Sequence, residues 1–258
     1  MDSQSKHAKS WYGRGLPYLS HKRLPGHLLV IEGTDGVGRS THIALLKEWL
    51  EARGYAVVNT GLRRSQLAGR GIERAKAGNT LDPITLNLLY ATDFWDRLER
   101  QILPAMRAGM VALVDRYIFS LMARARVRGL TAEWVENLFG FALVPDLVVY
   151  LDIDIEHLVP RVLSSTTGFD YWESGQDYLP SPDVYANFVE HQTRLLAEFR
   201  RLAAEHAFTT VDARRPVSEV FKDLCEAIEP VVQSMATFGS DVTESAEVAS
   251  MRPSLPGT

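Results

Sequence analysis

The sequence of 258 residues contains a single cysteine, Cys225, and this scarcity restricts the chemistry available to the chain. One thiol excludes an intramolecular disulfide, which is the usage expected in a reducing cytoplasm. Cys225 lies on the apolar stripe of the segment VSEVFKDLCEAI, so we expect a buried structural thiol and no nucleophile. The seven histidines are scattered without the spacing of metal ligands.

Long apolar runs and an excess of positive charge are also missing. No segment reaches the roughly 20 apolar residues that cross a bilayer, and the N-terminal stretch lacks the apolar centre of a secretory signal. The formal net charge of -4 argues against general attraction to nucleic acid or to a membrane surface. A phosphate-binding protein needs only local positive charge. We therefore expect a cytoplasmic protein that binds small molecules, with neither nucleic acid nor membrane as a partner.

Composition divides the chain into three parts. Residues 1–26 are rich in Gly, Ser and Lys and predict a flexible N-terminal extension. Residues 27–232 have the composition of one folded domain with a substantial core. Residues 233–258 are dominated by Ser, Thr, Gly, Pro and Ala, which predicts a disordered C-terminal tail.

Short apolar runs alternate with longer amphipathic stretches in the central part, the pattern of a parallel sheet flanked by helices. The runs suited to strands are 27–33, 55–60, 110–115, 146–154 and 207–213. The helical stretches are 40–54, 82–108, 118–129, 131–142, 155–165, 181–206 and 216–229. The segments 62–81 and 164–182 predict loops. The sequence therefore predicts one α/β unit in three layers, around a central five-stranded parallel sheet.

The strongest chemical signal is GTDGVGRST, which follows the first strand and opens a helix, the context of a phosphate-binding P-loop. Its glycines let backbone N–H groups point inward at an anion, with the helix N-terminus behind them. Ser40 is placed to bring its hydroxyl to a Mg²⁺ ion that bridges phosphates. The candidate donor-binding residues are Gly33, Thr34, Asp35, Gly36, Val37, Gly38, Arg39, Ser40 and Thr41. The alternative is a glycine-rich turn without a ligand.

Arg39 stands where the P-loop pattern has lysine. Arginine keeps the positive charge but presents it as a wide planar fork, where lysine presents a compact ammonium. We expect phosphate binding to survive this change.

Four segments together resemble the thymidylate kinases, a family of P-loop nucleoside-monophosphate kinases, over about residues 28–228. They are VIEGTDGVGRST, ILPAMRAGMVALVDRYIFS, PDLVVYLDIDIEHLVPRV and FTTVDARRPVSEVF. The resemblance implies a P-loop NTPase fold with a lid loop, ATP and Mg²⁺ as cofactors, and a homodimer. We expect the interface on the predicted helix 82–108.

The resemblance also implies roles for individual residues. Asp115 would hold Mg²⁺ or orient the acceptor phosphate, Arg116 would bind that phosphate as a fork, and Asp35 would lie near the acceptor's sugar. Asp115 and Arg116, together with Arg39, form the predicted catalytic set. The alternative for Asp115 is a cap on the following helix.

Other implied roles concern the donor side. Residues 164–182 would form the lid that excludes water, and residues 213–216 would line the adenine. Arg161 would lie at the base of the lid near the donor nucleotide, or else be a solvated helix residue.

The acceptor side departs from the family's pattern. The family's Thr-Arg-Glu-Pro-Gly-Gly segment is TGLRRS here, so Arg63 or Arg64 would replace its phosphate-binding arginine. Phe94 occupies the place of a second such arginine, and Arg97 lies one turn further along the same face. We therefore predict substrate contacts for Asp35, Arg63, Phe94, Arg97 and Arg116.

Two further departures lie near the base and the lid. Ala123-Arg124-Ala125 replaces a segment that helps to hold thymine, and we interpret Arg124, Arg126 and Arg128 as a solvated helix face. The lid has Asp170-Tyr171-Trp172-Glu173 and lacks the family's usual arginine. We hypothesise that Arg39 combines the roles of the missing lysine and the missing arginine.

Three functions remain open on the sequence. The first is ATP-dependent phosphorylation of dTMP, or a closely related nucleotide, to the diphosphate. The second is a P-loop kinase for another small acceptor, and the third is a nucleotide-binding protein with impaired catalysis.

Overall fold

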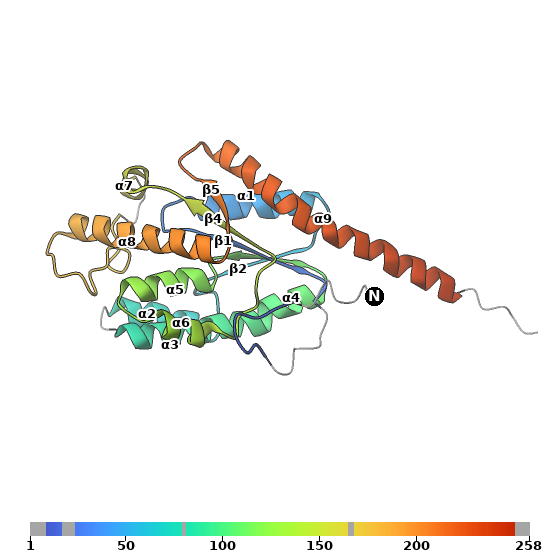
Figure 1. The fold of residues 1–258 in the computed structure, drawn as a ribbon, viewed down its shortest axis with the longest axis horizontal. Coiled ribbons are helices and arrows are strands. Elements are labelled where there is room, and N and C mark those ends of the chain that lie inside the picture. The colour runs from blue at the N-terminus through green and yellow to red at the C-terminus, as the bar shows by residue number, and fades with distance from the viewer. Residues whose placement is uncertain (1–8, 17–23, 79–80, 165–167, 251–258) are drawn as a thin grey trace, which may run out of the picture.

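Five parallel strands form one central sheet in the order β2-β3-β1-β4-β5 (Figure 1). The computed structural model describes residues 9–16, 24–78, 81–164 and 168–250, with residues 235–250 as backbone only. The strands are β1 (His27–Glu32), β2 (Val57–Gly61), β3 (Val111–Asp115), β4 (Leu147–Asp152) and β5 (Thr209–Asp212). Each lies within or next to a predicted strand, so the predicted five-stranded parallel sheet is confirmed.

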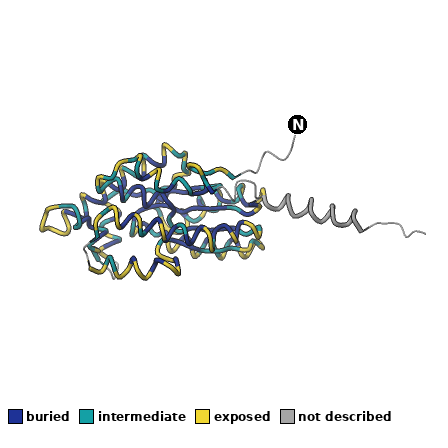
Figure 2. Tube along the Cα trace, turned by 90° about the horizontal axis from the view of Figure 1, so that it is seen from below, coloured by how far each residue is buried: buried dark blue, intermediate teal, exposed yellow. Residues whose placement is uncertain are grey.

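The sheet is buried on both faces because its central strand carries apolar side chains at successive positions. Successive side chains of a strand point to opposite faces. Leu28 and Val30 of β1 accordingly join one core cluster, and Leu29 and Ile31 join the other. Leu29 pairs with Leu113 of β3. Figure 2 shows the buried residues gathered along the sheet and on the inner sides of the helices.

Helices cover both faces of the sheet and complete three layers (Figure 1). The second cluster packs under α1 (Arg39–Ala52), α7 (Ile155–Leu163) and α9 (Val217–Ser250). The first packs under α2 (Gly69–Ala77), α3 (Pro83–Arg97), α4 (Leu103–Arg107), α5 (Ile118–Val127) and α6 (Ala132–Phe139). Helix α8 (Val184–Glu205) contributes to both clusters, for example through Phe188 and Phe199.

The predicted helix 82–108 consists of three consecutive helical segments. Asp82 caps α3 by accepting a hydrogen bond from the Ile84 N–H at 2.8 Å, with Pro83 in the first turn. A π-helical segment, η2 (Leu98–Ile102), joins α3 to α4. Pro104 in the first turn of α4 has no N–H to continue the α-helical ladder, which explains a local change of hydrogen bonding here.

Two predictions about helices were wrong. Residues 69–77 form α2, although the segment 62–81 was predicted to be a loop. Its two glycines lower helix propensity, and burial of Ile72 in the core outweighs that cost. Helix α9 runs to Ser250 and includes most of the segment predicted to be a disordered tail, since no proline follows Pro230 within it. The predicted tail residues 251–258 lie outside the described residues.

Part of the predicted flexible N-terminal extension packs against the domain. Trp11 forms a β-bridge with Leu143, and the ring of Tyr12 meets that of Phe119 edge-on at 5.7 Å. Leu16 is buried in the first core cluster. Residues 9–16 are therefore a packed strap, which corrects that prediction, whereas residues 1–8 and 17–23 lie outside the part of the chain that the structure describes.

Cys225 lies partly buried on α9 against the second core cluster, as expected of a structural thiol. Burial raises the pKa of its thiol to about 11, so the nucleophilic thiolate is scarce at neutral pH. A search of the described helices for a stretch both long and apolar enough to cross a membrane finds none.

Candidate functional site at the carboxyl ends of the strands

The glycine-rich loop between β1 and α1 has the backbone conformation that its sequence predicts. Gly33, Gly36 and Gly38 have φ angles of 148°, 81° and 98°, in the left-handed region that side chains disfavour. Gly38 occupies the N-cap position of α1, and the exposed hydroxyls of Ser40 and Thr41 follow in the first turn. The loop therefore wraps around the N-terminus of a 14-residue helix, which is suited to an anion.

Arg39 turns back from α1 and ties this loop to the end of β3. Its guanidinium is 6% exposed, and it donates through Nη1 to the carbonyl oxygens of Gly33 and Thr34. Its Nε donates to Oδ1 of Asp115 at 2.9 Å. The planar guanidinium thus binds the phosphate loop and Asp115 at the same time. Its N–H groups point in fixed directions, whereas a lysine ammonium would have no such fixed geometry.

Asp115 faces the site and makes no capping bond to the next helix among the described residues. The N-cap of α5 is Tyr117, which has no side-chain cap. Besides Arg39, the carboxylate of Asp115 lies 4.0 Å from Nη2 of Arg64. The interpretation of Asp115 as a helix cap is therefore excluded.

Arg116 is held in a strained backbone conformation and directed at the phosphate loop. Its φ is 67°, which costs a side-chain-bearing residue about 1–2 kcal/mol. The guanidinium pairs with Asp35, and its Nε has no hydrogen-bond partner within the described part of the chain. Burial, and then the charge of Arg124, lowers the pKa of Arg116 to about 9. Asp35 also pairs with Arg124.

Glu32 maintains the turn that carries Arg116. This fully buried carboxylate accepts hydrogen bonds from the N–H groups of Tyr117 at 2.8 Å and Ser120 at 3.2 Å, and from the Ser120 hydroxyl at 2.5 Å. Burial raises its pKa, against the opposing effect of these bonds. The sequence placed Glu32 next to the phosphate loop but gave no indication of its partners on α5.

The loop after β2 is fixed to α3 by a buried ion pair. Asp93 accepts hydrogen bonds from the N–H groups of Arg63 and Ser65, each at 3.1 Å, and from Nε of Arg97 at 2.9 Å. Asp93 and Arg97 are 0% exposed, and both Nη atoms of Arg97 lack a partner among the described residues. Arg63 has a φ of 64°, the same strained conformation as Arg116. Arg64, rather than Arg63, extends toward Asp115.

Phe94 lies in the core, and not against the substrate as predicted. Its ring is 0% exposed and meets Tyr117 edge-on at 4.9 Å and Phe139 at 6.3 Å. This side of α3 faces α5 and α6, which gather the aromatic side chains. Tyr90, one turn earlier on α3, reaches the neighbouring pocket instead.

A polar and aromatic pocket, the acceptor-side pocket, opens beside Asp35. Its lining comes from the phosphate loop, from α2, α3 and α8, from α5 with its C-cap, and from the segment after α7: Asp35, Lys76, Leu86, Asn87, Tyr90, Leu121, Arg124, Arg128, Trp172, Glu173 and His191. The prediction that Arg124, Arg126 and Arg128 form a solvated face was wrong. Helix α5 is packed between the site and α8, so Arg126 pairs with Glu198 at 3.0 Å and Arg128 with Asp177 at 2.7 Å.

Residues 168–182 of the predicted lid supply part of this pocket's lining and are linked to the phosphate loop through Gln192. Trp172 is buried, and its Nε1 donates to the carbonyl of Lys76 at 3.0 Å. Nε2 of Gln192 donates to the carbonyl of Glu173 at 2.8 Å, and the Thr34 hydroxyl donates to Oε1 of the same Gln192 side chain. Residues 165–167 of the predicted lid lie outside the described residues.

A second groove, the donor-side groove, lies on the other side of the phosphate loop. Its lining residues are Gly36, Val37, Gly38, Thr41, His42, Arg161, Ala213, Arg214, Arg215, Pro216 and Val217. Nη2 of Arg161 donates to the carbonyl of Ala213 at 2.8 Å, and its Nη1 donates to that of Val37 at 3.3 Å. Arg161 therefore joins the groove's two walls and is not a free solvated residue.

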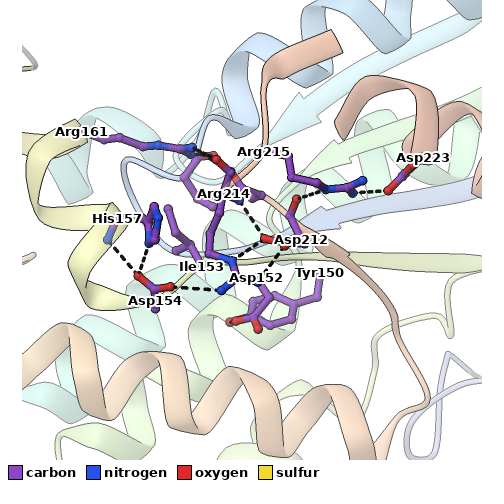
Figure 3. Close-up of polar contacts among 12 residues, drawn as sticks. Tyr150, Asp152, Ile153, Asp154, His157, Arg161, Asp212, Arg214, Arg215 and Asp223 are labelled. Atoms are coloured by element: carbon purple, nitrogen blue, oxygen red, sulfur yellow. Dashed lines mark hydrogen bonds and ion pairs between the residues drawn. The ribbon is translucent and has the colours of Figure 1, made fainter. Parts of the chain in front are cut away.

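The loop 213–216 is stiffened by ion pairs at the ends of β4 and β5 (Figure 3). Arg214 contacts Asp212 at 2.8 Å and lies 3.5 Å from Asp154, and Arg215 pairs with Asp223 of α9. Arg214 and Arg215 also line the donor-side groove, so these ion pairs fix one of its walls.

Comparison with known proteins agrees with this arrangement. A family model described as thymidylate kinase matches residues 31–224. The chain belongs to the thymidylate kinase family. "Probable thymidylate kinase 2" of Saccharolobus solfataricus is 35% identical over 77% of this chain and 93% of its own. "Thymidylate kinase" of Leifsonia xyli is 35% identical over 78% of this chain and 93% of its own. "Probable thymidylate kinase" of Thermococcus gammatolerans is 31% identical over 81% of this chain and 99% of its own.

Within this thymidylate kinase fold, sequence reasoning missed Tyr90, Asn87 and Lys76 in the acceptor-side pocket. Asn87 and Tyr90 are three residues apart on α3, and their position near the N-terminal part of a predicted helix was the available signal. The sequence carried no such signal for Lys76, because the helix to which it belongs was predicted to be a loop. Arg124 was noted as part of an arginine run, but its partner Asp35 is distant in sequence.

Replacing Gly36 by alanine is expected to weaken ATP binding at least tenfold. The new Cβ would meet Cγ2 of Val162 at 2.7 Å, and the φ of 81° disfavours any side chain. The matched control is Gly71→Ala in α2, where no atom lies within 4 Å of the added Cβ. We expect that control to bind ATP normally and to be up to about 1 kcal/mol more stable. Calorimetric titration with ATP measures the affinity of both variants, and thermal unfolding measures their stability. Unchanged ATP affinity of Gly36→Ala would contradict this account of the loop.

Proposed function

We propose that this chain is a nucleoside-monophosphate kinase that transfers the γ-phosphoryl group of ATP to dTMP. The observation that carries the proposal is the position of the two pockets. Asp35 lines the acceptor-side pocket, and its neighbour Gly36 lines the donor-side groove. A donor and an acceptor bound there would meet across the phosphate loop, next to Arg39 and Asp115. Family membership and the relatives' names support dTMP as the acceptor.

The charges around the loop suit two phosphorylated ligands. Arg39, Arg64, Arg116 and Arg124 gather around the two carboxylates of Asp35 and Asp115. Positive charge is therefore in excess where donor and acceptor phosphates would approach each other. Phosphoryl transfer depends mainly on positioning and charge neutralisation, so no nucleophilic side chain is needed.

Each part of the chain then has a role. The backbone N–H groups of residues 33–41 hold the donor phosphates, and Arg161 supports the wall of the nucleotide groove. Arg116 and Arg64 hold the acceptor phosphate, which attacks the γ-phosphorus in line while ADP leaves. Arg97, predicted to contact the substrate, is fully buried against Asp93 and instead positions the loop that carries Arg64. Arg39 lies between the two and neutralises charge on the transferred group.

The residues present fit a magnesium ion. The Ser40 hydroxyl is exposed in the first turn of α1, and the Asp115 carboxylate faces the same site; hydroxyl and carboxylate oxygens suit this hard cation. Ser40 and Asp115 would hold Mg²⁺. When bound, the ion would supply charge neutralisation between the phosphates of ATP.

We also propose a cytoplasmic homodimer that associates through α3 and takes no nucleic acid partner. Ile84 and Leu88 are 48% and 49% exposed and lie four residues apart on one face of α3. An apolar pair of this kind supports association there. The single cysteine supports a reducing compartment, and the net charge of -4 supports small-molecule ligands.

Turnover across an acceptor panel tests the function. ATP consumption with Mg²⁺ is measured for nucleoside monophosphates and nucleosides, and we expect dTMP to be the preferred acceptor. The Ser40→Ala, Asp115→Ala double variant should lose at least about 10³-fold in kcat, because it lacks both proposed metal ligands. Turnover with another acceptor alone would replace dTMP, and tight ATP binding without any turnover would refute the kinase.

A further inference from the structure

We propose that Lys76 selects the acceptor by donating a hydrogen bond to a carbonyl oxygen on the edge of a pyrimidine base, such as O4 of thymine or uracil. The inference rests on the proposed kinase function and adds a specificity-determining residue to it. It predicts that 4-keto pyrimidine nucleotides bind better than their 4-amino counterparts.

The position of Lys76 is fixed by its neighbours in the lid. It lies in the last turn of α2, and Nε1 of Trp172 donates to its backbone carbonyl at 3.0 Å. Its Nζ lies 5.7 Å from the centroid of the Trp172 ring. Both residues line the acceptor-side pocket. The Lys76 side chain therefore extends over an aromatic face at the pocket wall.

The Lys76 ammonium is partly buried and has no hydrogen-bond acceptor among the described residues. None of the described residues accepts a hydrogen bond from it or forms an ion pair with it. Burial, and then the charges of Arg124 and Arg63, lowers its pKa to about 8, whereas Asp170 and Glu173 raise it. A buried donor without a partner costs free energy that a ligand oxygen would recover.

The surroundings of Lys76 suit the base better than the phosphate. The guanidinium groups that would bind phosphate gather around Asp35 and Asp115 at the carboxyl ends of the strands. The lining of the pocket that Lys76 shares also includes Tyr90, Trp172, Leu86 and Leu121, whose flat and apolar surfaces suit a planar ring. Lys76 thus places a polar donor within the part of the pocket that would hold a base.

The choice between base types follows from the chemistry of the ammonium group. An ammonium only donates hydrogen bonds. It can bond the 4-keto oxygen of thymine or uracil, but it repels the 4-amino group of cytosine, which also donates there. A buried mismatch of this kind costs more than a missing contact, so discrimination of about 10- to 100-fold is expected.

Binding and turnover of Lys76→Met test the proposal. We expect its Kd and KM for dTMP to rise about 10- to 100-fold, with dCMP little affected, so that the preference for dTMP over dCMP narrows. Lys76→Arg, which keeps the donors, should restore part of the preference. Lys222→Met on α9 is the matched control, since its side chain is 76% exposed there.

The pH dependence supplies a readout that a structural role would not change. In the parent protein, affinity for dTMP should be constant below about pH 8 and fall as the pH rises through it, because the ammonium loses its proton. In Lys76→Met the fall through pH 8 should be absent, which leaves only the later fall near pH 9 that Arg116 contributes. Thermal unfolding of each variant checks that the fold is intact.

The outcomes separate this inference from the function on which it rests. If the parent protein phosphorylates dTMP and Lys76→Met keeps the same ratio of dTMP to dCMP affinity, the role of Lys76 is refuted and the kinase stands. If the parent protein binds dTMP and dCMP equally in calorimetry, the role is refuted whether or not turnover occurs. If the parent protein shows no turnover with any acceptor, yet the ratio of dTMP to dCMP affinity narrows in Lys76→Met, the base contact is kept and the kinase is refuted.

Discussion

Arg39→Ala is expected to lower kcat by about 10³-fold or more, the largest catalytic effect that we predict for a single side chain. Arg39 is the buried cation that contacts both the phosphate loop and Asp115. Its removal would leave the charge of the transferred phosphoryl group without its nearest fixed neutralisation. Stopped-flow or steady-state kinetics with saturating ATP and dTMP measure the change.

Arg39→Lys tests whether the arginine does more than supply a charge. Lysine restores the residue of the usual P-loop pattern, yet it loses the fork that reaches Asp115 and the loop carbonyls together. We expect kcat to fall about 10- to 100-fold, with ATP binding retained. Full activity of this variant would show that Arg39 does not combine two roles. Arg53→Lys, at the exposed C-cap of α1, is the matched control and should match the parent protein.

Asp93→Ala is expected to cost about 3–5 kcal/mol in the free energy of unfolding. Asp93 and Arg97 are 0% exposed, so the substitution would leave a buried guanidinium without its only ion-pair partner among the described residues. The N–H groups of Arg63 and Ser65 would lose their acceptor as well. The KM for the acceptor should also rise, because this loop is released. Urea denaturation and steady-state kinetics measure the two effects.

The double variant Asp93→Ala, Arg97→Met shows how much of the stability loss in Asp93→Ala comes from the unpaired charge of Arg97 and how much from lost packing. It removes the uncompensated charge, so we expect it to recover more than half of the stability lost by the single variant. A double variant as unstable as Asp93→Ala would contradict this explanation. Glu190→Ala, in an exposed pair with Arg194, is the control and should cost no more than about 0.5 kcal/mol.

The strands and the phosphate loop could be predicted because their signals are local. A buried parallel strand needs a short run of apolar residues, and β1 is such a run. The loop that follows needs glycine wherever φ is positive, and Gly33, Gly36 and Gly38 meet that need. These requirements act on neighbouring residues, so no knowledge of distant contacts was needed.

The helices showed where local signals become insufficient. Thr131 and Asp82 cap their helices by accepting backbone hydrogen bonds, which is a local signal. Helix α2 was missed, because its glycines argue against a helix and the burial of Ile72 in the core outweighs their cost. Tertiary packing here outweighs intrinsic propensity.

By itself, the sequence determined the family, the order of the strands along the chain and the position of the phosphate loop, all of which depend on adjacent residues. The tertiary structure alone decided which side chains line the acceptor-side pocket. Phe94 and Tyr90 lie one turn apart on α3, yet one joins the core and the other lines the pocket. Arg124 meets Asp35, and Lys76 meets Trp172, across long separations in sequence. Helical periodicity groups residues on a face, but only the packing of neighbouring elements decides whether that face meets core, solvent or substrate.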